Sequence, residues 1–380
     1  MNLSKTLALL AAAVLAIGCM ATKPPYRQAG ADHSLKEAYS DKFFIGTALN
    51  LTQIKGRNPK ALEVLERHFN SIVAENCMKS MYLQPKEGEF FFDDADAFVA
   101  LGEKNNMHIV GHTLIWHSQT PSWFFVDKDG QQVSREVLID RMKQHITTVV
   151  SRYKGRIHGW DVVNEAVLDN GEWRKSKFYE IIGEDFVRLA FEFAHAADPN
   201  AELYYNDYST ANPTKRNGIA RMVKQVLDQG GRVHAIGMQE HHGLDNPPLE
   251  EVEQTILTFA GLGTKVMVTE MDISVLPHAR PNMGAEISET YAYREALNPY
   301  TKGLPDSAMQ ALGDRYTEFF KLYLKHQDKI TRVTMWGISD ADSWKNGFPI
   351  RGRTDYPLLF DRAYEPKPFV SELVTLAKNK

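Results

Sequence analysis

The chain alternates eight strand-like segments with eight amphipathic, helix-like segments, and this alternation limits the possible folds more than any other feature. The strand candidates are short and rich in β-branched or aromatic residues: Phe43–Asn50, Ser71–Cys77, His108–Trp116, Ile157–Glu165, Glu202–Tyr208, His234–His242, Lys265–Ile273 and Arg332–Ser339. The segments that follow them carry apolar residues at helical spacing: Pro59–Phe69, Asp94–Asn106, Ser134–Tyr153, Glu184–Ala197, Thr214–Gln229, Leu249–Leu262, Asp314–Ile330 and Pro366–Lys378. Eight βα pairs in series close into a barrel more naturally than they fan into a doubly wound sheet. We therefore expect a single-domain (β/α)8 TIM barrel of the α/β class.

The N-terminus predicts export. Lys5 precedes an apolar run over residues 7–17, which is too short to span a bilayer but long enough for the core of a signal peptide. The run ends in a sequence that resembles a bacterial lipobox: Leu15-Ala16-Ile17-Gly18-Cys19. Lipid on Cys19 would anchor the protein to a membrane, in the periplasm or at the cell surface. Because Ala16 stands where Leu is usual, cleavage without lipidation and secretion stay open as the alternative.

These sequence features divide the chain into a signal peptide with lipobox (1–19), a tether (20–39) and the barrel domain (40–380). The tether is polar, contains Pro24-Pro25 and ends in a possible short helix, Leu35 to Tyr39. Cys77 is the only cysteine besides Cys19, so the mature protein has no intrachain disulfide. Its stability must come from the core, which a barrel of this size can supply.

The charge balance limits the class of partner. With 44 Lys+Arg against 48 Asp+Glu, the formal net charge is −4, which gives no electrostatic reason to expect nucleic acid. A neutral or weakly charged partner fits better. We expect a monomer that contacts a membrane only through the N-terminal lipid.

The longest interruption of the alternation is Ser274–Leu312, between the seventh strand and its helix. It is rich in Pro, Asn, Gly and Tyr, and it would lie on the C-terminal face, which carries the active site in such barrels. The insertion is therefore a wall or lid of the site, or alternatively a decorative surface loop.

Two of the buried strands end on carboxylates. The fourth runs through Trp160 and Val163 and ends on Asn164-Glu165, and the seventh ends near Glu270. Each ending alone is equally consistent with a strand that leaves the core into a solvated turn. Together, two carboxylates at the ends of parallel strands can face one bond, which is the arrangement that glycoside hydrolysis requires.

The remaining strand ends also carry polar and aromatic side chains, as a barrel enzyme requires. They are Glu75-Asn76-Cys77-Met78-Lys79, His112 with Trp116-His117, Asn206-Asp207-Tyr208, Gln239-Glu240-His241-His242, Asp272, and Trp336 with Trp344. The sequence lacks the motifs typical of a metal site, a His-Glu-x-x-His helix or a cysteine pair. It also lacks the Gly-x-Ser-x-Gly elbow of a serine nucleophile and a phosphate-binding loop. We therefore expect no metal and no cofactor, and chemistry by two carboxylates.

With these residues in place, the chain resembles glycoside hydrolase family 10, the retaining endo-β-1,4-xylanases, over about residues 35 to 378. Seven motifs in order carry the resemblance: Glu75-Asn76-x-Met-Lys79, Gly111-His112-Thr-Leu-x-Trp116-His117, Trp160-Asp-Val-Val-Asn164-Glu165, Tyr205-Asn-Asp-Tyr208, Gly237-Met-Gln239-x-His241, Thr269-Glu270-Met-Asp272 and Trp336-Gly-x-Ser-Asp-x-x-Ser-Trp344. Two positions depart from the usual pattern, Ser80 after the second-strand motif and Glu240 where a small residue is common. Both bear on outer sugar subsites and substrate decoration rather than on the carboxylate pair.

The resemblance implies a substrate, xylan or xylo-oligosaccharide, and a role for each site residue. Glu165 would be the acid/base and Glu270 the nucleophile. The sugars on the non-reducing side would be held by Glu75, Asn76, Lys79 and His112. The subsite of the cleaved residue would be walled by Trp116, Gln239, His241, Trp336 and Trp344, and Tyr208 would stack on the sugar just past the scissile bond.

Physical chemistry agrees with these roles. A retaining mechanism needs one carboxylate and one carboxylic acid about 5–5.5 Å apart, and ionised Glu270 raises the proton affinity of Glu165. A hydrogen bond from His241 would favour the anion of Glu270. Asn164 is placed to hold the sugar's 2-hydroxyl; its alternative is a simple strand cap.

Two rival functions share part of this pattern. A retaining β-1,4-glucanase or mannanase would also have the Asn-Glu and Glu pair, but Glu75-Asn76-x-x-Lys79 and Gln239-x-His241 favour xylan. A lipid-tethered polysaccharide-binding protein with a dead active site is the rival of another class. Both carboxylates and the residues around them are present, which speaks against it.

Overall fold

The computed structural model describes residues 34–277 and 291–378. The predicted signal peptide, the lipobox with Cys19 and most of the predicted tether lie outside the described residues, as do residues 278–290 of the insertion. In the described part of the chain, no helix is long and apolar enough to cross a membrane.

Eight parallel strands close into a barrel, which confirms the predicted fold class. Their order is β6-β5-β4-β3-β2-β1-β9-β8, and pairing of β6 with β8 closes the sheet. The bounds are β1 Phe44–Leu49, β2 Ser71–Ala74, β3 His108–Trp116, β4 Gly159–Asn164, β5 Glu202–Asp207, β6 Ala235–Met238, β8 Lys265–Ser274 and β9 Ile330–Met335. A short additional strand, β7 (His241–Gly243), pairs with β8 beyond the end of β6.

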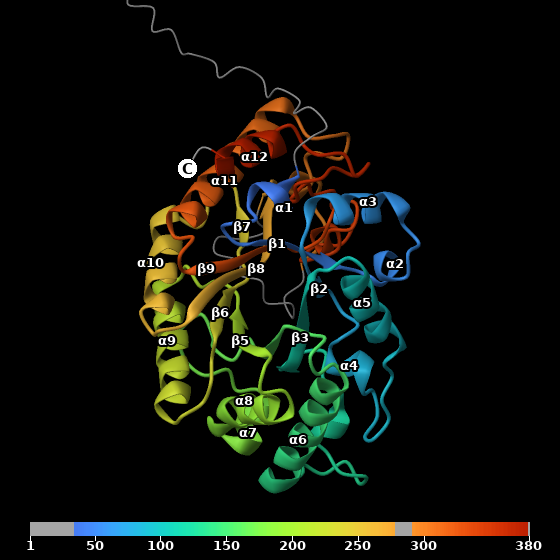
Figure 1. Cartoon of the computed structure of the whole chain (residues 1–380), viewed down its shortest axis with the longest axis vertical. Helices are drawn as coiled ribbons and strands as arrows, with labels where there is room; N and C mark the ends of the chain where they lie inside the picture. Colours follow the sequence, from blue (N-terminus) through green and yellow to red (C-terminus); the bar gives the residue numbers. More distant parts are fainter. Residues whose placement is uncertain (1–33, 278–290, 379–380) are drawn as a thin grey trace, which may run out of the picture.

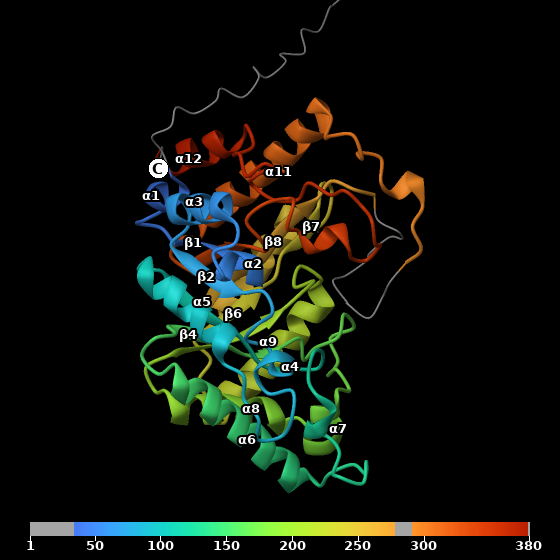
Figure 2. The same ribbon diagram turned by 90° about the vertical axis from the view of Figure 1, so that its right-hand side faces the viewer.

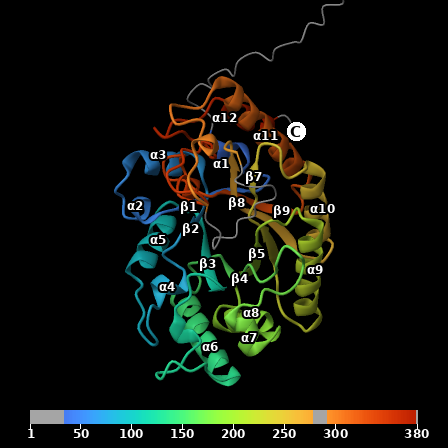
Figure 3. The same cartoon turned by 180° about the vertical axis from the view of Figure 1, so that it is seen from behind.

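Helices form an outer ring around the barrel, visible from the front and from behind (Figures 1 and 3). The longer ones are α3 Pro59–His68, α5 Asp93–Lys104, α6 Arg135–Arg152, α8 Asp185–Ala197, α9 Pro213–Asp228, α10 Leu249–Ala260, α11 Asp306–Lys325 and α12 Val370–Lys378. The shorter ones are α1 Leu35–Ala38, α2 Leu51–Ile54, α4 Ser80–Leu83 and α7 Lys177–Ile182, with 3-10 turns η1 Ser122–Phe124, η2 Glu295–Leu297 and η3 Trp344–Asn346. Local signals set several starts: Asn58 and Asn212 cap helices whose first residue is proline, and Ser134 caps α6.

The strands are buried on both faces, which explains their nearly continuous apolar sequences. The larger core cluster lies between the strands and the surrounding helices. A smaller cluster takes one residue from each of six strands and Trp336 just past β9: Ala48, Val73, Val110, Tyr204, Ala235, Met267 and Trp336. This second cluster fills the barrel and ends at the polar C-terminal face.

The elements differ from their predicted bounds at three informative places. The predicted strand His234–His242 is two strands, because Glu240 adopts a left-handed conformation with φ of 61° and breaks it. β9 ends at Met335, and Gly337 (φ 127°) turns the chain where the prediction continued the strand to Ser339. Helix α11 begins at Asp306, so the predicted insertion, which ran to Leu312, was too long.

The described part of the insertion packs against the loop after β9. Asn298 accepts a hydrogen bond from the backbone N–H of Thr354 (2.8 Å) and donates to the carbonyl of Gly352 (3.3 Å). The hydroxyl of Tyr356 donates to the carbonyl of Tyr300 (2.8 Å). Figure 2 shows residues 291–305, in orange, on the same side of the barrel as α4 and α7. The described insertion therefore braces a neighbouring loop, and its role as a lid stays untested.

The first described residues already belong to the barrel's packing. Ser34 caps α1, and Leu35 and Tyr39 are fully buried. The hydroxyl of Tyr39 donates to the carbonyl of Leu373 on α12 (2.8 Å), which joins the two ends of the described chain.

Candidate functional site

A cleft of about 600 Å³, partly open to solvent, lies at the C-terminal ends of the strands. It is lined by Glu75, Asn76, Lys79, His112, Trp116, Gln119, Asn164, Glu165, Gln239, His241, Glu270, Trp336 and Trp344. The structure thus brings together twelve of the thirteen predicted sugar-contacting and catalytic residues. Gln119 is an addition, and Tyr208 lies elsewhere.

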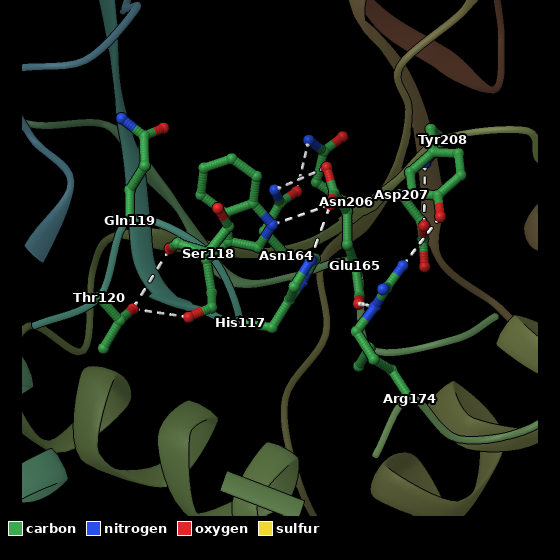
Figure 4. Close-up of polar contacts among 12 residues, drawn as sticks. His117, Ser118, Gln119, Thr120, Asn164, Glu165, Arg174, Asn206, Asp207 and Tyr208 are labelled. Atoms are coloured by element: carbon green, nitrogen blue, oxygen red, sulfur yellow. Dashed lines mark hydrogen bonds and ion pairs between the residues drawn. The ribbon is translucent and has the colours of Figure 1, made fainter. Parts of the chain in front are cut away.

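Glu165 follows directly on β4 and has a left-handed backbone, with φ of 58°. Arg174 supports this strained conformation: its Nε donates to the carbonyl oxygen of Glu165 (2.9 Å), as Figure 4 shows. Nε1 of Trp116 donates a hydrogen bond to Oε2 of the carboxyl (2.8 Å), and Nε2 of Gln239 donates one to Oε1 (2.9 Å). Glu165 is therefore fixed in both backbone and side chain.

Burial raises the pKa of Glu165 above its ordinary value. The hydrogen bonds from Gln239 and Trp116 oppose this rise, while the charge of Glu270 adds to it. Only 5% of the residue is exposed, so little solvent is available to stabilise its anion. A raised pKa suits a carboxyl that must supply a proton.

Glu270 lies on β8, as buried as Glu165, but its pKa is lowered. Burial alone would raise the pKa of Glu270; the hydrogen bond from His241 is the largest effect in the other direction. Nε2 of His241 lies 3.3 Å from Oε2 of Glu270, so the hydrogen bond that the sequence analysis made conditional is present. A lowered pKa keeps Glu270 ionised, as a nucleophile requires.

The charge of His241 is itself supported by Asp272. Burial would lower the pKa of His241, but Asp272 and Glu270 outweigh burial and raise it to about 9. Nδ1 of His241 lies 3.1 Å from Oδ1 of Asp272. The two residues are paired neighbours, His241 on β7 and Asp272 on β8. His241 is thus a buried cation between two carboxylates.

Asn206, at the end of β5, connects the two glutamates. Its Nδ2 donates to Oε1 of Glu270 (2.7 Å) and to Oδ1 of Asn164 (3.0 Å), and Asn164 in turn donates to Oε1 of Glu165 (3.2 Å). Thr269 fixes the amide by donating to its Oδ1 (2.6 Å). A Cβ at Gly237 would lie 2.4 Å from that oxygen, so glycine is required there.

Lys79, Asn76 and Gln119 form a polar cluster at one end of the cleft. Nζ of Lys79 donates to Asn76 (3.1 Å) and Gln119 (2.9 Å) and lies 4.9 Å from the Trp116 ring centroid. Burial lowers the pKa of Lys79 and raises that of neighbouring Glu75. These fixed donors and acceptors suit the hydroxyls of a sugar.

Besides Trp116, two further indole rings line the cleft, and both are held by their neighbours. Trp344 donates Nε1 to Oδ2 of Asp272 (2.7 Å) and stacks on Phe348, with 4.9 Å between centroids. Trp336 lies edge-on to His112 at 5.5 Å, and Nδ1 of His112 is 2.9 Å from Oδ2 of Asp161. Both rings leave apolar surface to the cleft beside polar groups, as a sugar site needs.

Tyr208 lines a neighbouring pocket, open to solvent, that shares His241 with the cleft. Nζ of Lys215 lies 3.2 Å from the centroid of its ring, and Arg174 donates to its hydroxyl (2.8 Å). Tyr208 is only 3% exposed. Its stacking on a sugar stays a prediction.

No individual role was predicted from the sequence for Gln119, Arg174, Asn206 and Asp272. Asn206 and Asp272 stand at strand ends, and their chemistry could have suggested a role. Arg174 lies in a loop without a strand signal, and only the fold brings it to Glu165. Among the described residues, no group of three or more His, Cys, Asp or Glu side chains is arranged to hold a metal ion.

Comparison with known proteins agrees with this geometry. The model of glycosyl hydrolase family 10 matches residues 34–376. The chain is 51% identical over 343 residues to endo-1,4-beta-xylanase A of Xylanibacter ruminicola, covering 90% of this chain and 93% of the relative. It is 42% identical over 345 residues to an endo-1,4-beta-xylanase of Geobacillus stearothermophilus, covering 90% and 98%. A solved GH10 endoxylanase from a sugarcane soil metagenome superposes with a TM-score of 0.88 at 47% identity, covering 90% of this chain and all of that one. The chain belongs to glycosyl hydrolase family 10.

Proposed function

We propose that the protein is an endo-1,4-β-xylanase that cleaves β-1,4-xylosidic linkages by a double displacement with retention of configuration. One observation carries the proposal: two glutamates are buried in the same cleft, and their surroundings shift their pKa values in opposite directions. Such a pair supplies one acid and one nucleophile. The names of the relatives support xylan as the substrate.

In the first step, ionised Glu270 attacks the anomeric carbon while Glu165 protonates the departing oxygen. The hydrogen bonds from His241 and Asn206 keep the attacking carboxylate oriented. The glycosidic bond breaks, a glycosyl ester forms on Glu270, and the leaving sugar departs with the proton from Glu165.

In the second step, Glu165 acts as a base. Esterification removes the charge of Glu270, which had raised the pKa of Glu165, so Glu165 keeps its negative charge more readily. It takes a proton from water, and the hydroxide equivalent displaces Glu270 from the opposite face. Two inversions give net retention.

The remaining cleft residues hold the sugars in this proposal. Asn164 meets the 2-hydroxyl of the cleaved residue, and its amide is already oriented by Asn206. Glu75, Asn76, Lys79 and His112 bind the sugars on the non-reducing side. Trp336 and Trp344 cover the flat C–H face of the ring.

A comparison of polysaccharides tests the substrate. Purified protein should release reducing sugar from xylan at a far higher rate than from carboxymethylcellulose or mannan. Glu270→Gln, which keeps the shape of the side chain, serves as the control for contaminating activity. Preferential hydrolysis of carboxymethylcellulose or mannan would indicate the rival glycosidase, and binding to xylan without hydrolysis over long incubation would indicate a binding protein.

A further inference from the structure

The turn between β6 and β7 carries one hydrogen-bonding partner for each glutamate. Gln239 donates to Glu165 (2.9 Å), and His241 lies 3.3 Å from Glu270. Between them stands Glu240, whose φ of 61° is unfavourable for any residue but glycine. Both contacts to the glutamates therefore depend on one strained backbone position, and such strain persists only where the surroundings enforce it.

Part of that enforcement comes from β8, through backbone hydrogen bonds. The N–H of Glu270 donates to the carbonyl of Gln239 (3.1 Å), and the N–H of Asp272 donates to the carbonyl of Glu240 (3.4 Å). The second bond is long, so the carbonyl of the strained residue is weakly held. The backbone therefore restrains Glu240 itself only weakly, although Gln239 before it and β7 after it are held by further backbone hydrogen bonds.

The side chain of Glu240 adds a second attachment, to helix α11. Its Oε2 lies 2.6 Å from Nε2 of His242 and accepts the hydroxyl of Tyr323 at 3.3 Å. The ring of His242 stacks on Phe319 with 4.7 Å between centroids. Phe319 and Tyr323 are four residues apart, so they share one face of α11 and contact both members of the Glu240–His242 pair.

This network is almost completely removed from solvent. Glu240 is 3% exposed, His242 is 7% exposed and Tyr323 is fully buried. A buried carboxylate must be paired and hydrogen-bonded, because leaving it unpaired costs several kcal/mol. The pairing therefore constrains where Glu240 can lie.

We propose that Glu240 is a positioning residue: its carboxyl, held by His242 and Tyr323, locks the β6–β7 turn so that Gln239 and His241 reach the two glutamates. The effect of Glu240 on catalysis rests on the proposed function, whereas its effect on the positions of Gln239 and His241 does not. His241 faces Glu270 and Asp272 of β8 and Lys345 of η3. On the side of α11, Arg315 lies over the ring of Phe319, the ring on which His242 stacks.

Three variants separate positioning from general stability. Glu240→Gly tolerates the left-handed backbone but removes the attachment to α11. Tyr323→Phe removes one hydroxyl from the network, and Tyr323 does not line the cleft. Tyr39→Phe is the matched control, since it removes an equally buried hydroxyl hydrogen bond at the α1–α12 contact.

The first measurement needs no activity. The ring of His241 is titrated by NMR and assigned by its disappearance in His241→Gln. In the wild type its pKa lies near the value of about 9 that Asp272 and Glu270 impose. We expect a lower pKa in Glu240→Gly, a smaller decrease in Tyr323→Phe, and no change in Tyr39→Phe.

The second measurement is the pH profile of kcat/KM on an aryl β-xylobioside. A loosened His241 no longer lowers the pKa of Glu270, and a loosened Gln239 no longer lowers that of Glu165. Both limbs of the profile should therefore move to higher pH in Glu240→Gly, with a loss of about tenfold to about 100-fold in kcat/KM. A merely structural role would lower the melting temperature and scale the profile without moving it.

The outcomes are distinct. An unchanged His241 pKa in Glu240→Gly and Tyr323→Phe, or a profile that changes only in height, would overturn the positioning role. Should Glu240→Gly fail to fold, Tyr323→Phe decides the question alone. A wild type that does not hydrolyse the xylobioside would contradict the proposed function, and the NMR titration would still test the position of His241.

Discussion

Glu165 and Glu270 show how much of a residue's chemistry is set by its neighbours. Burial acts on both carboxyls in the same direction and by itself would raise both pKa values. The difference arises because Glu270 receives His241, which is charged through Asp272, whereas Glu165 receives neutral indole and amide donors. The cation beside Glu270 thus contributes most to separating the pKa values of the two carboxyls.

The pH profile should respond to the indole of Trp116. In the proposed mechanism, activity requires ionised Glu270 and protonated Glu165, so we expect kcat/KM to rise through the pKa of Glu270 and to fall through that of Glu165. Trp116→Phe removes a hydrogen bond that lowers the pKa of Glu165, so the alkaline limb should move to higher pH while the acidic limb stays. Trp336→Phe, which has no such bond, is the control. An alkaline limb that stays in place or moves down would contradict this assignment of Glu165.

The contribution of Trp344 should be moderate. Replacing it by Ala removes the hydrogen bond to Asp272 and the proposed apolar contact with the sugar, and we expect a loss of transition-state stabilisation of at most about 3 kcal/mol. Loss of either glutamate should cost orders of magnitude in turnover. Measurement of kcat/KM and thermal unfolding checks both. Equal losses in all three variants would indicate that Trp344 supports the barrel itself.

Residue type and position in the sequence identify the site only in part. Glu165 could be found because it follows a recognisable buried strand, and Glu270 because it lies in the C-terminal half of another. Arg174 could not, because its contact with the carbonyl of Glu165 depends on a loop path that no local pattern encodes. The strain at Glu165 was likewise invisible, since backbone conformation at a strand end is set by tertiary contacts.

At the scale of elements, close approach between strands fixes the amides of the site. Gly237 on β6 leaves room for Asn206 on β5, and a Cβ there would lie 2.4 Å from Oδ1 of Asn206 and 2.7 Å from Cγ2 of Thr269. The orientation of Asn206, and through it that of Glu270, therefore depends on the spacing of three strands.

Gly237→Ala should reduce activity more than stability. The added methyl must displace Asn206, so the hydrogen bond from Asn206 to Glu270 should weaken. The overpacking itself should cost about 1–3 kcal/mol in folding free energy. Gly102→Ala is the control, because its Cβ would meet Ile109 and Ile72 between helix and barrel, away from the cleft. Both should lower the denaturation midpoint, but only Gly237→Ala should reduce kcat of the folded protein. Equal kcat in the two variants would show that the displacement of Asn206 does not matter.

Elements with strong periodicity were predictable, and those set by tertiary contacts were not. β3 has the predicted bounds, and most long helices begin or end within two residues of prediction. The break between β6 and β7 follows from the left-handed Glu240, which no propensity suggests. The short helix α2 was missed, although its capping box of Asn50 and Gln53 is a recognisable local signal.

At the scale of the whole molecule, the described chain is one barrel with its two ends joined through α1 and α12. Helix α1, at the start of the described chain, contacts α12 in the ring of helices (Figure 1), whereas the cleft is formed at the C-terminal ends of the strands. A preceding tether could therefore hold the enzyme at a surface without blocking the substrate. Export and anchoring stay our proposals.

Cys19→Ser tests the anchor. We propose that the chain is exported and held to a membrane through lipid on Cys19. In the native host, the variant should leave the membrane fraction or remain unprocessed, as measured by fractionation and mass spectrometry of the N-terminus. A variant that stays in the membrane fraction and is cleaved at the same position would contradict the lipobox.

The roles of the two glutamates are tested most directly with an aryl xylobioside whose leaving group needs no protonation. Glu165→Ala should form the glycosyl ester on Glu270 and then stall; azide, which needs no deprotonation, should restart turnover and give the β-glycosyl azide. Glu270→Ala should be nearly inactive, and azide in the emptied space should attack from the α face and give the α-azide. A β-azide from the Glu270 variant, or an inverted hydrolysis product from the wild type by proton NMR, would contradict both the assigned roles and the retaining mechanism.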